Sequence, residues 1–208
     1  YAVRSQERTQ ASIEAGYFKS GLVPIYHADG RLALDRDEHP RPGTTMESMV
    51  GLNPSFEKMG KTLYDGQVRT FDDICKSVYP NVKAMTHVHH AGNSSGVVDG
   101  ASAILLASPK YAKAHGLKPR ARIVMTATAG TEPVIMLTAP GPAAEICLRK
   151  AGMTKADIDL FEVNEAFAAV VLKFQKDLGV GDDIINVAGG SIALGHPIGA
   201  TGPMLIQV

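Results

Sequence analysis

The sequence predicts an α/β layered fold, because short apolar runs that suit strands alternate with stretches of helical periodicity. The clearest helix covers residues 164–178, where apolar side chains recur at helical spacing and Gly179 follows as a stop. Short strand-like runs, residues 160–163 and 184–187, lie on either side of it. The fold class rests mainly on this alternation.

Three further helices are expected, each closed by a glycine. They cover residues 1–16, 110–115 and 142–150, and the last has a proline near its first turn. Two more apolar runs extend the pattern. Residues 101–107 suit a buried strand or helix, and residues 121–127 suit a strand.

The region between the first helix and the regular pattern is different. Residues 17–56 contain four prolines and only short apolar pieces, which is typical of a surface subdomain rather than a buried sheet. Residues 57–86 are mixed in polarity and show no clear period. No element is predicted there.

The composition is that of an ordinary soluble globular protein, with 45% hydrophobic and 20% charged residues. Lys plus Arg and Asp plus Glu both total 21, and this zero net charge argues against a nucleic-acid partner. No apolar run is long enough to span a bilayer, and the first residues do not form a signal peptide. Both ends suggest a chain cut inside longer elements.

The two cysteines, Cys75 and Cys147, lie far apart and outside any CxxC spacing. This argues against a disulfide framework and fits a reducing compartment, so we expect the cytoplasm, or the mitochondrial matrix in a eukaryote. His87 and His89 would share one face of a strand, which suggests a metal site. No Cys, Asp or Glu stands beside them at ligand spacing, so no metal is expected.

Residues 188–202 are the densest candidate for chemistry, with five glycines in fifteen residues after a short strand. The run lacks the Lys-Ser or Lys-Thr pair of a Walker loop and the spacing of a dinucleotide loop. His196 is held between a glycine and a proline, so it could serve as a general base or an oxyanion donor. A histidine in a tight structural turn explains the spacing equally well.

For two other motifs, a purely structural role explains the sequence at least as well as a functional role. Asn164 stands between a strand and a helix, where Asn is a favoured N-cap; it could also belong to a site at the carboxyl end of the strand. Residues 91–96 form a loop of small polar residues that could bind an extended ligand, although most such loops are turns.

Together these three motifs resemble the thiolase family. Asn164 to Ala168 (Asn-Glu-Ala-Phe-Ala) matches one block, and Gly190 to Gly202 matches the long glycine–histidine signature. Ala91 to Ala101 matches the loop that lines the pantetheine arm of coenzyme A. The resemblance covers nearly the whole chain and is weakest over residues 57–86. That stretch is similar to an insertion in the thiolase subunit of fatty-acid β-oxidation trifunctional complexes.

The resemblance implies two similar α/β halves stacked in five layers, αβαβα, with a loop subdomain inserted in the first half. On that template the chain is a truncated thiolase. Residues 1–96 would be most of the loop subdomain on the coenzyme A side. Residues 97–120 would end the N-terminal half, and residues 121–208 would begin the C-terminal half.

The implied activity is acyl transfer: thiolytic cleavage of 3-ketoacyl-coenzyme A to acetyl-coenzyme A and a shortened acyl-coenzyme A, or the reverse Claisen condensation. His196 would activate a cysteine and donate to the thioester oxygen, and Asn164 would position a water in the oxyanion hole. The nucleophile would lie before Tyr1 and a second catalytic cysteine beyond Val208. The isolated chain is therefore expected to be inactive.

The resemblance also implies contacts to coenzyme A, which would be a substrate, with no further cofactor. Ser95 would line the pantetheine with Ala91 nearby, and Arg41 and Ser48 would approach the nucleotide. The two residues expected to border the reacting thioester are Met136 and Phe167. Core packing explains these two apolar residues equally well.

The expected partners are acyl-coenzyme A and coenzyme A, a second copy of the chain, and a hydratase–dehydrogenase subunit. Residues 57–86 could dock such a subunit or a membrane surface. The alternative function is a non-catalytic module from a degenerate thiolase, binding coenzyme A or lipid or acting as a scaffold.

Overall fold

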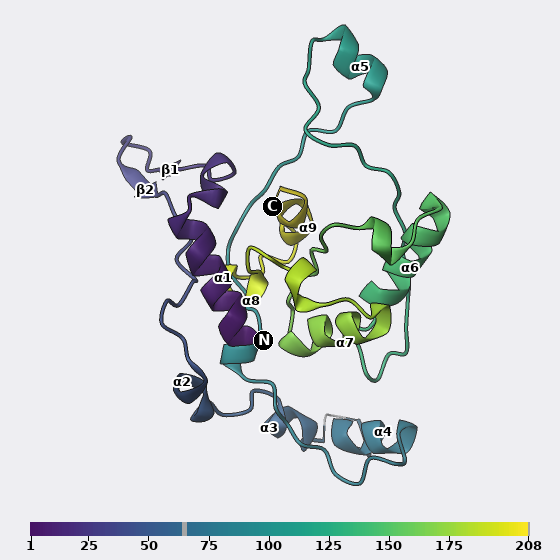
Figure 1. Ribbon diagram of the computed structural model, residues 1–208. Coiled ribbons are helices and arrows are strands. Elements are labelled where there is room, and N and C mark those ends of the chain that lie inside the picture. Colours follow the sequence, from purple (N-terminus) through teal and green to yellow (C-terminus); the bar gives the residue numbers. More distant parts are fainter. Residues whose placement is uncertain (64–65, 208) are drawn as a thin grey trace.

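The computed structural model describes residues 1–63 and 66–207, and helices make up most of its regular structure (Figure 1). The α-helices are α1 (Ala2–Glu14), α2 (Met46–Val50), α3 (Glu57–Gly60), α4 (Phe71–Val78), α5 (Pro109–Ala114), α6 (Pro140–Ala151), α7 (Ala168–Leu178), α8 (Ser191–Leu194) and α9 (Thr201–Gln207). The strands are β1 (Ile25–Tyr26) and β2 (Leu32–Leu34), which pair antiparallel. Short 3₁₀ helices cover Tyr17–Ser20, Ala91–Asn93, Lys155–Asp157 and Asp182–Ile184.

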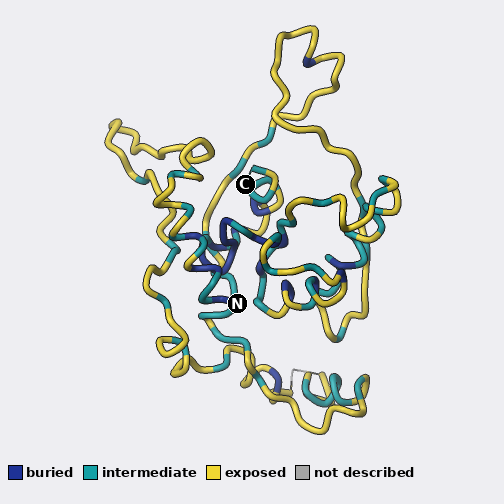
Figure 2. Tube along the Cα trace, viewed as in Figure 1, coloured by how far each residue is buried: buried dark blue, intermediate teal, exposed yellow. Residues whose placement is uncertain are grey.

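The core lies where α7 packs against the chain on either side of it. Its buried side chains are Val163, Val171, Phe174, Leu178 and Ile185. Figure 2 shows the buried positions concentrated along α7, the segment through α8 and the facing side of α1. The glycine loop therefore lies in the best-packed part of the molecule.

Helix α1 covers α8 with an unusually polar face. The buried positions on this helix are Ala2, Ser5, Gln6 and Thr9, spaced as one helical face. Three of these four side chains are polar. Ser5 donates to Glu165 and Gln6 to the carbonyl of Ile192, whereas the buried Thr9 hydroxyl has no hydrogen-bond partner among the described residues. The first helix is confirmed, and its polar contacts prove central to the site.

The other helices follow the sequence pattern with one shift. Helices α5 and α6 confirm the predicted helices, and Gly152 ends α6 in the left-handed conformation. Helix α7 begins at Ala168, four residues later than predicted, and its N-cap is Phe167. The interpretation of Asn164 as the helix cap is therefore wrong.

The predicted strands are largely absent from the described residues. Residues 160–163 and 184–187 are reduced to one parallel bridge, between Phe161 and Ile185. Residues 101–107 and 121–127 form no strand and are mostly exposed. An apolar run becomes a strand only where another segment satisfies its backbone hydrogen bonds, and within the described residues no segment does so for these two runs.

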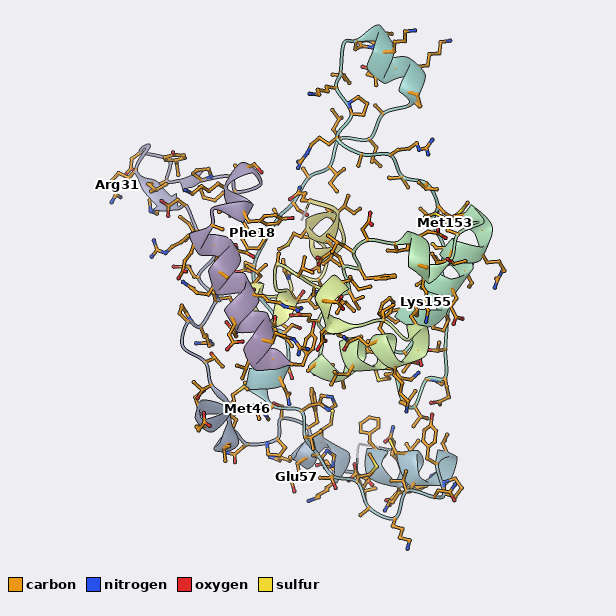
Figure 3. The ribbon with its side chains drawn as sticks, viewed as in Figure 1. Phe18, Arg31, Met46, Glu57, Met153 and Lys155 are labelled. Atoms are coloured by element: carbon orange, nitrogen blue, oxygen red, sulfur yellow. The ribbon has the colours of Figure 1, made fainter. Side chains whose placement is uncertain are left out.

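The remaining chain is peripheral, as predicted for residues 17–56. Figure 3 shows Arg31 at the outer turn of the β1–β2 pair, and Met46 and Glu57 on the outer segment of α2 and α3. Helix α4 begins with a reciprocal cap between Thr70 and Asp73. Among the described residues no helix is long and apolar enough to cross a membrane.

Candidate active site

The loop that follows α8 presents His196 toward the small polar loop of residues 91–96. Gly195 ends α8 with a φ of 91°, and a Cβ there would lie 2.6 Å from a methyl of Val98. The amide N–H of His196 donates to the carbonyl of Gly96 across 2.8 Å. Two sequence motifs almost a hundred residues apart thus share one hydrogen bond, and glycine permits their close approach.

Both ring nitrogens of His196 are held by side chains. Nδ1 lies 2.7 Å from Oγ1 of Thr201, and Nε2 lies 3.2 Å from Nδ2 of Asn164. The amide nitrogen of an asparagine can only donate, so Nε2 accepts and Nδ1 carries the proton. In this arrangement the lone pair of Nε2 lies on the side of Asn164.

Asn164 is fixed in its turn by the glycine loop. Its Oδ1 accepts a hydrogen bond of 2.6 Å from Oγ of Ser191, the first residue of α8. The prediction that Asn164 and His196 reach one place is confirmed by their contact. Sequence reasoning missed Ser191 and Thr201, because only the folded loop shows which of its polar side chains turn inward.

Ser95 and Phe167 belong to two segments that hydrogen-bond to each other just after Asn164. Both the N–H and Oγ of Ser95 donate to the carbonyl of Ala166, at 3.0 and 3.2 Å. Phe167 pairs with the neighbouring residue Ser94 in an antiparallel bridge, and its ring lies 4.8 Å from that of His89. Of the residues predicted to bind substrate, these two are therefore tied to the segment 166–167 that directly follows Asn164.

The other predicted substrate residues are more dispersed. Ala91 begins a 3₁₀ turn just before the Ser94–Ser95 segment. Arg41 is exposed, and its backbone N–H donates to the side-chain oxygen of Gln6. Ser48 closes a reciprocal cap with Thr45 at the start of α2. This cap uses the Ser48 hydroxyl in local structure.

Met136 is not brought to this group of residues. Its side chain is 62% exposed and its φ is 55°, in the loop that leads into α6. That loop lies well away from α8 in Figure 1. The explanation of Met136 by core packing is wrong, because the residue is exposed; its place beside the thioester stays a prediction.

The paired histidines do not share a strand face. His87 bonds the Asp72 carboxylate at 3.1 Å, whereas the ring of His89 packs against Phe167. Burial lowers the pKa of His89. Within residues 1–63 and 66–207, no cluster of three metal-ligating side chains is present.

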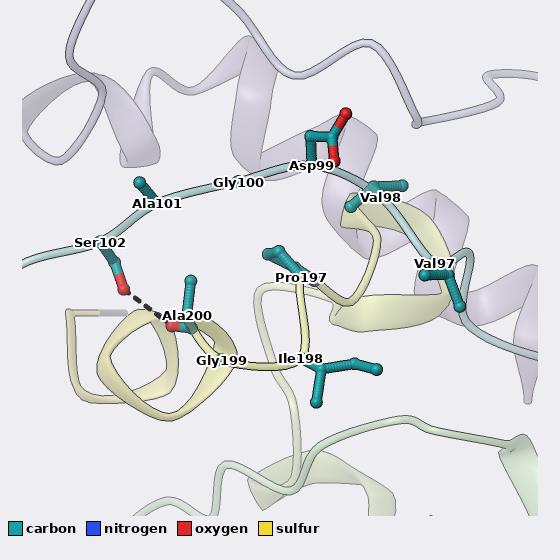
Figure 4. A pocket seen from close by; sticks show the side chains of 10 residues that line it. All are labelled: Val97, Val98, Asp99, Gly100, Ala101, Ser102, Pro197, Ile198, Gly199 and Ala200. Carbon is teal, nitrogen blue, oxygen red and sulfur yellow. Dashed lines mark hydrogen bonds between the residues drawn. The ribbon is translucent and has the colours of Figure 1, made fainter.

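A groove of about 380 Å³ lies between the chain that follows Gly96 and the chain that follows His196 (Figure 4). Its walls are the segments 97–102 and 197–200, and they are joined by a hydrogen bond of 2.7 Å from Oγ of Ser102 to the carbonyl of Ala200. Apart from Asp99 and Ser102 the lining side chains are apolar or absent. The two free cysteines lie elsewhere, Cys75 on α4 and Cys147 on α6.

Comparison with known proteins accounts for this combination of motifs. The sequence matches the family model described as "Thiolase, N-terminal domain" over residues 1–68 and the one described as "Thiolase, C-terminal domain" over residues 117–207. The chain belongs to the thiolase family. The resemblance drawn from the three motifs is thereby confirmed.

Individual relatives agree in name and in fold. The chain is 41% identical to an acetyl-CoA acetyltransferase of Allochromatium vinosum over 99% of its length, and 44% identical to a 3-ketoacyl-CoA thiolase of Serratia proteamaculans over 97%. It superposes on the crystal structure of the Bacillus anthracis acetyl-CoA acetyltransferase with a TM-score of 0.80, at 37% identity and over 99% of its length. The thiolase-like layered fold is therefore confirmed.

The match covers only part of each relative. The chain spans 46% of the Allochromatium vinosum protein, 47% of the Serratia proteamaculans protein and 46% of the Bacillus anthracis chain. The predicted domain boundaries after residues 96 and 120 stay predictions.

Proposed function

We propose that the chain supplies the His196 and Asn164 side of a thiolase active site. The reaction would be thiolytic cleavage of 3-ketoacyl-coenzyme A in fatty-acid β-oxidation, or the reverse condensation. The observation that carries this proposal is the contact of 3.2 Å between Nδ2 of Asn164 and Nε2 of His196. It places a proton acceptor and an amide donor side by side, which is what acyl transfer through a thioester requires.

In the proposed reaction Nε2 of His196 takes the proton of a cysteine thiol, and the thiolate attacks the ketone carbon of the substrate. The bond between the α and β carbons breaks with its electrons on the departing acetyl-coenzyme A, whose α carbon takes a proton from the second cysteine expected outside these residues. The acyl group stays on sulfur until the thiol of a second coenzyme A displaces it. The second cysteine would recover a proton from the thiol of this second coenzyme A, and the imidazolium of His196 would return its proton to the first cysteine when the acyl group leaves. Protonation of Nε2 releases the Nδ2–H of Asn164, which then positions a water. That water and the protonated Nε2 of His196 stabilise the thioester oxygen that becomes negative.

The attacking cysteine would come from outside these 208 residues. Cys75 and Cys147 lie on α4 and α6, and both helices lie away from α8 in Figure 1. We expect that the 208-residue chain alone does not catalyse thiolysis. The groove beside His196 would be completed by the segment that carries the thiolate.

Coenzyme A would enter as a substrate along the loop that carries Ser95 and Ala91. The exposed guanidinium of Arg41 suits a phosphate contact, and Ser48 and Phe167 belong to the same proposed site. Met136 would approach the thioester only if the loop before α6 moved. A second copy of the chain and a hydratase–dehydrogenase subunit remain the proposed partners.

The test is thiolysis of 3-ketoacyl-coenzyme A by the full-length protein that contains these residues, with coenzyme A binding measured in parallel. Turnover of 3-ketoacyl-coenzyme A would support the proposed thiolase activity. Tight binding of coenzyme A without turnover would contradict it and favour the non-catalytic module.

A further inference from the structure

Glu165, the residue after Asn164, is fully buried, with an exposed fraction of 0%. Its neighbour Asn164 turns toward His196, while Glu165 turns the other way, toward α1. Burying a carboxylate is costly unless donors replace the lost water. The sequence pattern alone assigned no role to Glu165.

Four neutral donors surround the Glu165 carboxylate, two on each oxygen. The Tyr1 hydroxyl and the Asn186 amide donate to Oε1 across 2.6 and 3.2 Å. The Ser5 hydroxyl and the N–H of Ile192 donate to Oε2 across 2.7 and 3.0 Å. Burial and the adjacent Glu165 raise the pKa of Tyr1, which keeps its hydroxyl protonated as a donor.

These donors come from opposite sides of the site. Tyr1 and Ser5 belong to the start of α1, whereas Ile192 is the second residue of α8. Gly190 touches the same carboxylate, since a Cβ there would lie 2.4 Å from Cδ of Glu165. Glu165 therefore holds the chain both immediately before and immediately after Ser191.

Ser191 is the residue that orients Asn164. Its hydroxyl donates to Oδ1 of Asn164, which leaves Nδ2 to donate to His196. A displacement of Ser191 would free the Asn164 amide to rotate and would remove the fixed donor at Nε2. The path from α1 to His196 thus runs through an unbroken series of direct contacts.

We propose that Glu165 is a positioning residue that fixes the Asn164–His196 pair through Ser191 and makes α1 a structural part of the active site. Glu165 touches neither His196 nor the groove, so it takes no part in proton transfer. This inference rests on the proposed function only for its effect on catalysis. Its effect on His196 can be measured without any activity.

The experiment records which imidazole nitrogen of His196 carries hydrogen, by long-range ¹H–¹⁵N correlation spectra of the full-length protein that contains these residues. The resonance is assigned through His196→Gln. In the wild type we expect one tautomer, and in Glu165→Ala a mixture of two. Circular dichroism and the melting temperature show whether each variant is folded.

A second glutamate provides the matched control. Glu162 lies two residues before Asn164 and is half-buried near Glu165, but among the described residues it makes no hydrogen bond to the Ser191 segment. Glu162→Ala removes a carboxyl of the same kind and should leave the single tautomer of His196. A mixture in Glu162→Ala as large as in Glu165→Ala would overturn the inference, because general charge or packing would then explain both.

Two milder variants keep the test decisive if Glu165→Ala does not fold. Ser191→Ala removes the link to Asn164, and Ser5→Ala removes one donor from the carboxylate; both should produce a mixture, smaller for Ser5→Ala. An unchanged His196 spectrum in both would overturn the inference. So would a folded Glu165→Ala with the wild-type spectrum.

A kinetic measurement distinguishes failure of this inference from failure of the proposed function. In a full-length protein that catalyses thiolysis, Glu165→Ala should lower kcat roughly 10- to 100-fold through misplacement of the pair, with KM for coenzyme A changed less than about twofold. Unchanged kcat would overturn the inference. Absence of wild-type thiolysis would instead contradict the proposed function, and the tautomer measurement would still decide the role of Glu165.

Discussion

Asn164 and His196 lie 32 positions apart in the chain and meet through Nδ2 and Nε2 at 3.2 Å. Each has a second anchor, Ser191 for Asn164 and Thr201 for His196. These two anchors hold the pair in one orientation in the structure.

The first prediction concerns the histidine tautomer. Nδ1–H of His196 donates to Oγ1 of Thr201 at 2.7 Å, so the Nδ1–H form should dominate in the neutral imidazole. Thr201→Val removes that acceptor and should produce a mixture of tautomers at the same fold stability. Long-range ¹H–¹⁵N spectra measure both. A wild-type spectrum of the Nε2–H form would contradict these hydrogen-bond directions.

The second prediction concerns the amide donor. Asn164→Ala in the full-length protein should lower kcat by about 10²- to 10³-fold, the usual effect of losing one oxyanion donor. Asn81→Ala, at an exposed position, serves as the control and should leave kcat unchanged. Steady-state thiolysis measures both variants. A loss below about threefold for Asn164→Ala would mean that the amide is a structural contact only.

The sequence predicted the motifs of this site better than the reasons for their geometry. His196 was identified because a glycine and a proline fix its backbone, and that inference needs only adjacent residues. The cap assigned to Asn164 failed because a hydrogen bond to His196 competes with capping, and α7 starts four residues later. Ser191 and Glu165 have partners that are distant in sequence, so no local pattern could reveal them. Thr201 bonds His196 only five residues away, but that contact depends on how the loop turns.

The third prediction concerns the approach of α1 to the glycine loop. Gly189 has a φ of 90°, and a Cβ there would lie 1.9 Å from Oγ1 of Thr9 and 2.8 Å from the Ser5 carbonyl. Gly189→Ala should cost more than the roughly 1–2 kcal/mol of a left-handed residue, because the helix must also move. Urea unfolding measures this loss.

A glycine in the same loop gives the control for that substitution. Gly199 has no atom within 4 Å of an added Cβ, and Gly199→Ala should change the free energy of unfolding by less than about 0.5 kcal/mol. Equal losses at Gly189 and Gly199 would contradict the close contact between α1 and the loop.

The fourth prediction concerns pH. Burial, with the nearby Glu165 charge, raises the pKa of Glu162 from 4.5 to about 7. The folded state thus holds this proton more tightly, so the stability that Glu162 contributes is complete below pH 4.5 and is lost as pH rises through about 7.

Glu162→Gln should remove this pH dependence. The stability of the wild type relative to Glu162→Gln should fall between about pH 4.5 and pH 7 and then level off. Urea unfolding at a series of pH values measures the difference, and Glu145→Gln, at an exposed position, is the control. A constant difference across that range would show that Glu162 titrates normally.

The predicted strands at residues 101–107 and 121–127 show why strands are harder to predict from sequence than helices. The runs 101–107 and 121–127 have strand-like composition, yet they stay extended and unpaired, with Leu105 82% exposed and Val124 57% exposed. Helices close their hydrogen bonds within one segment, so α5, α6 and α7 could be predicted from their own residues. A strand depends on its neighbours, and among the described residues no strand pairs with these two runs.

The most direct test of the central claim is thiolysis of 3-ketoacyl-coenzyme A by the full-length protein before and after His196→Ala. His115→Ala serves as the matched control, because His115 is an exposed residue just after α5. We predict that turnover falls by at least about 10³-fold in His196→Ala and is unchanged in His115→Ala. Turnover that survives His196→Ala would contradict the assignment of the Asn164–His196 pair as the catalytic centre.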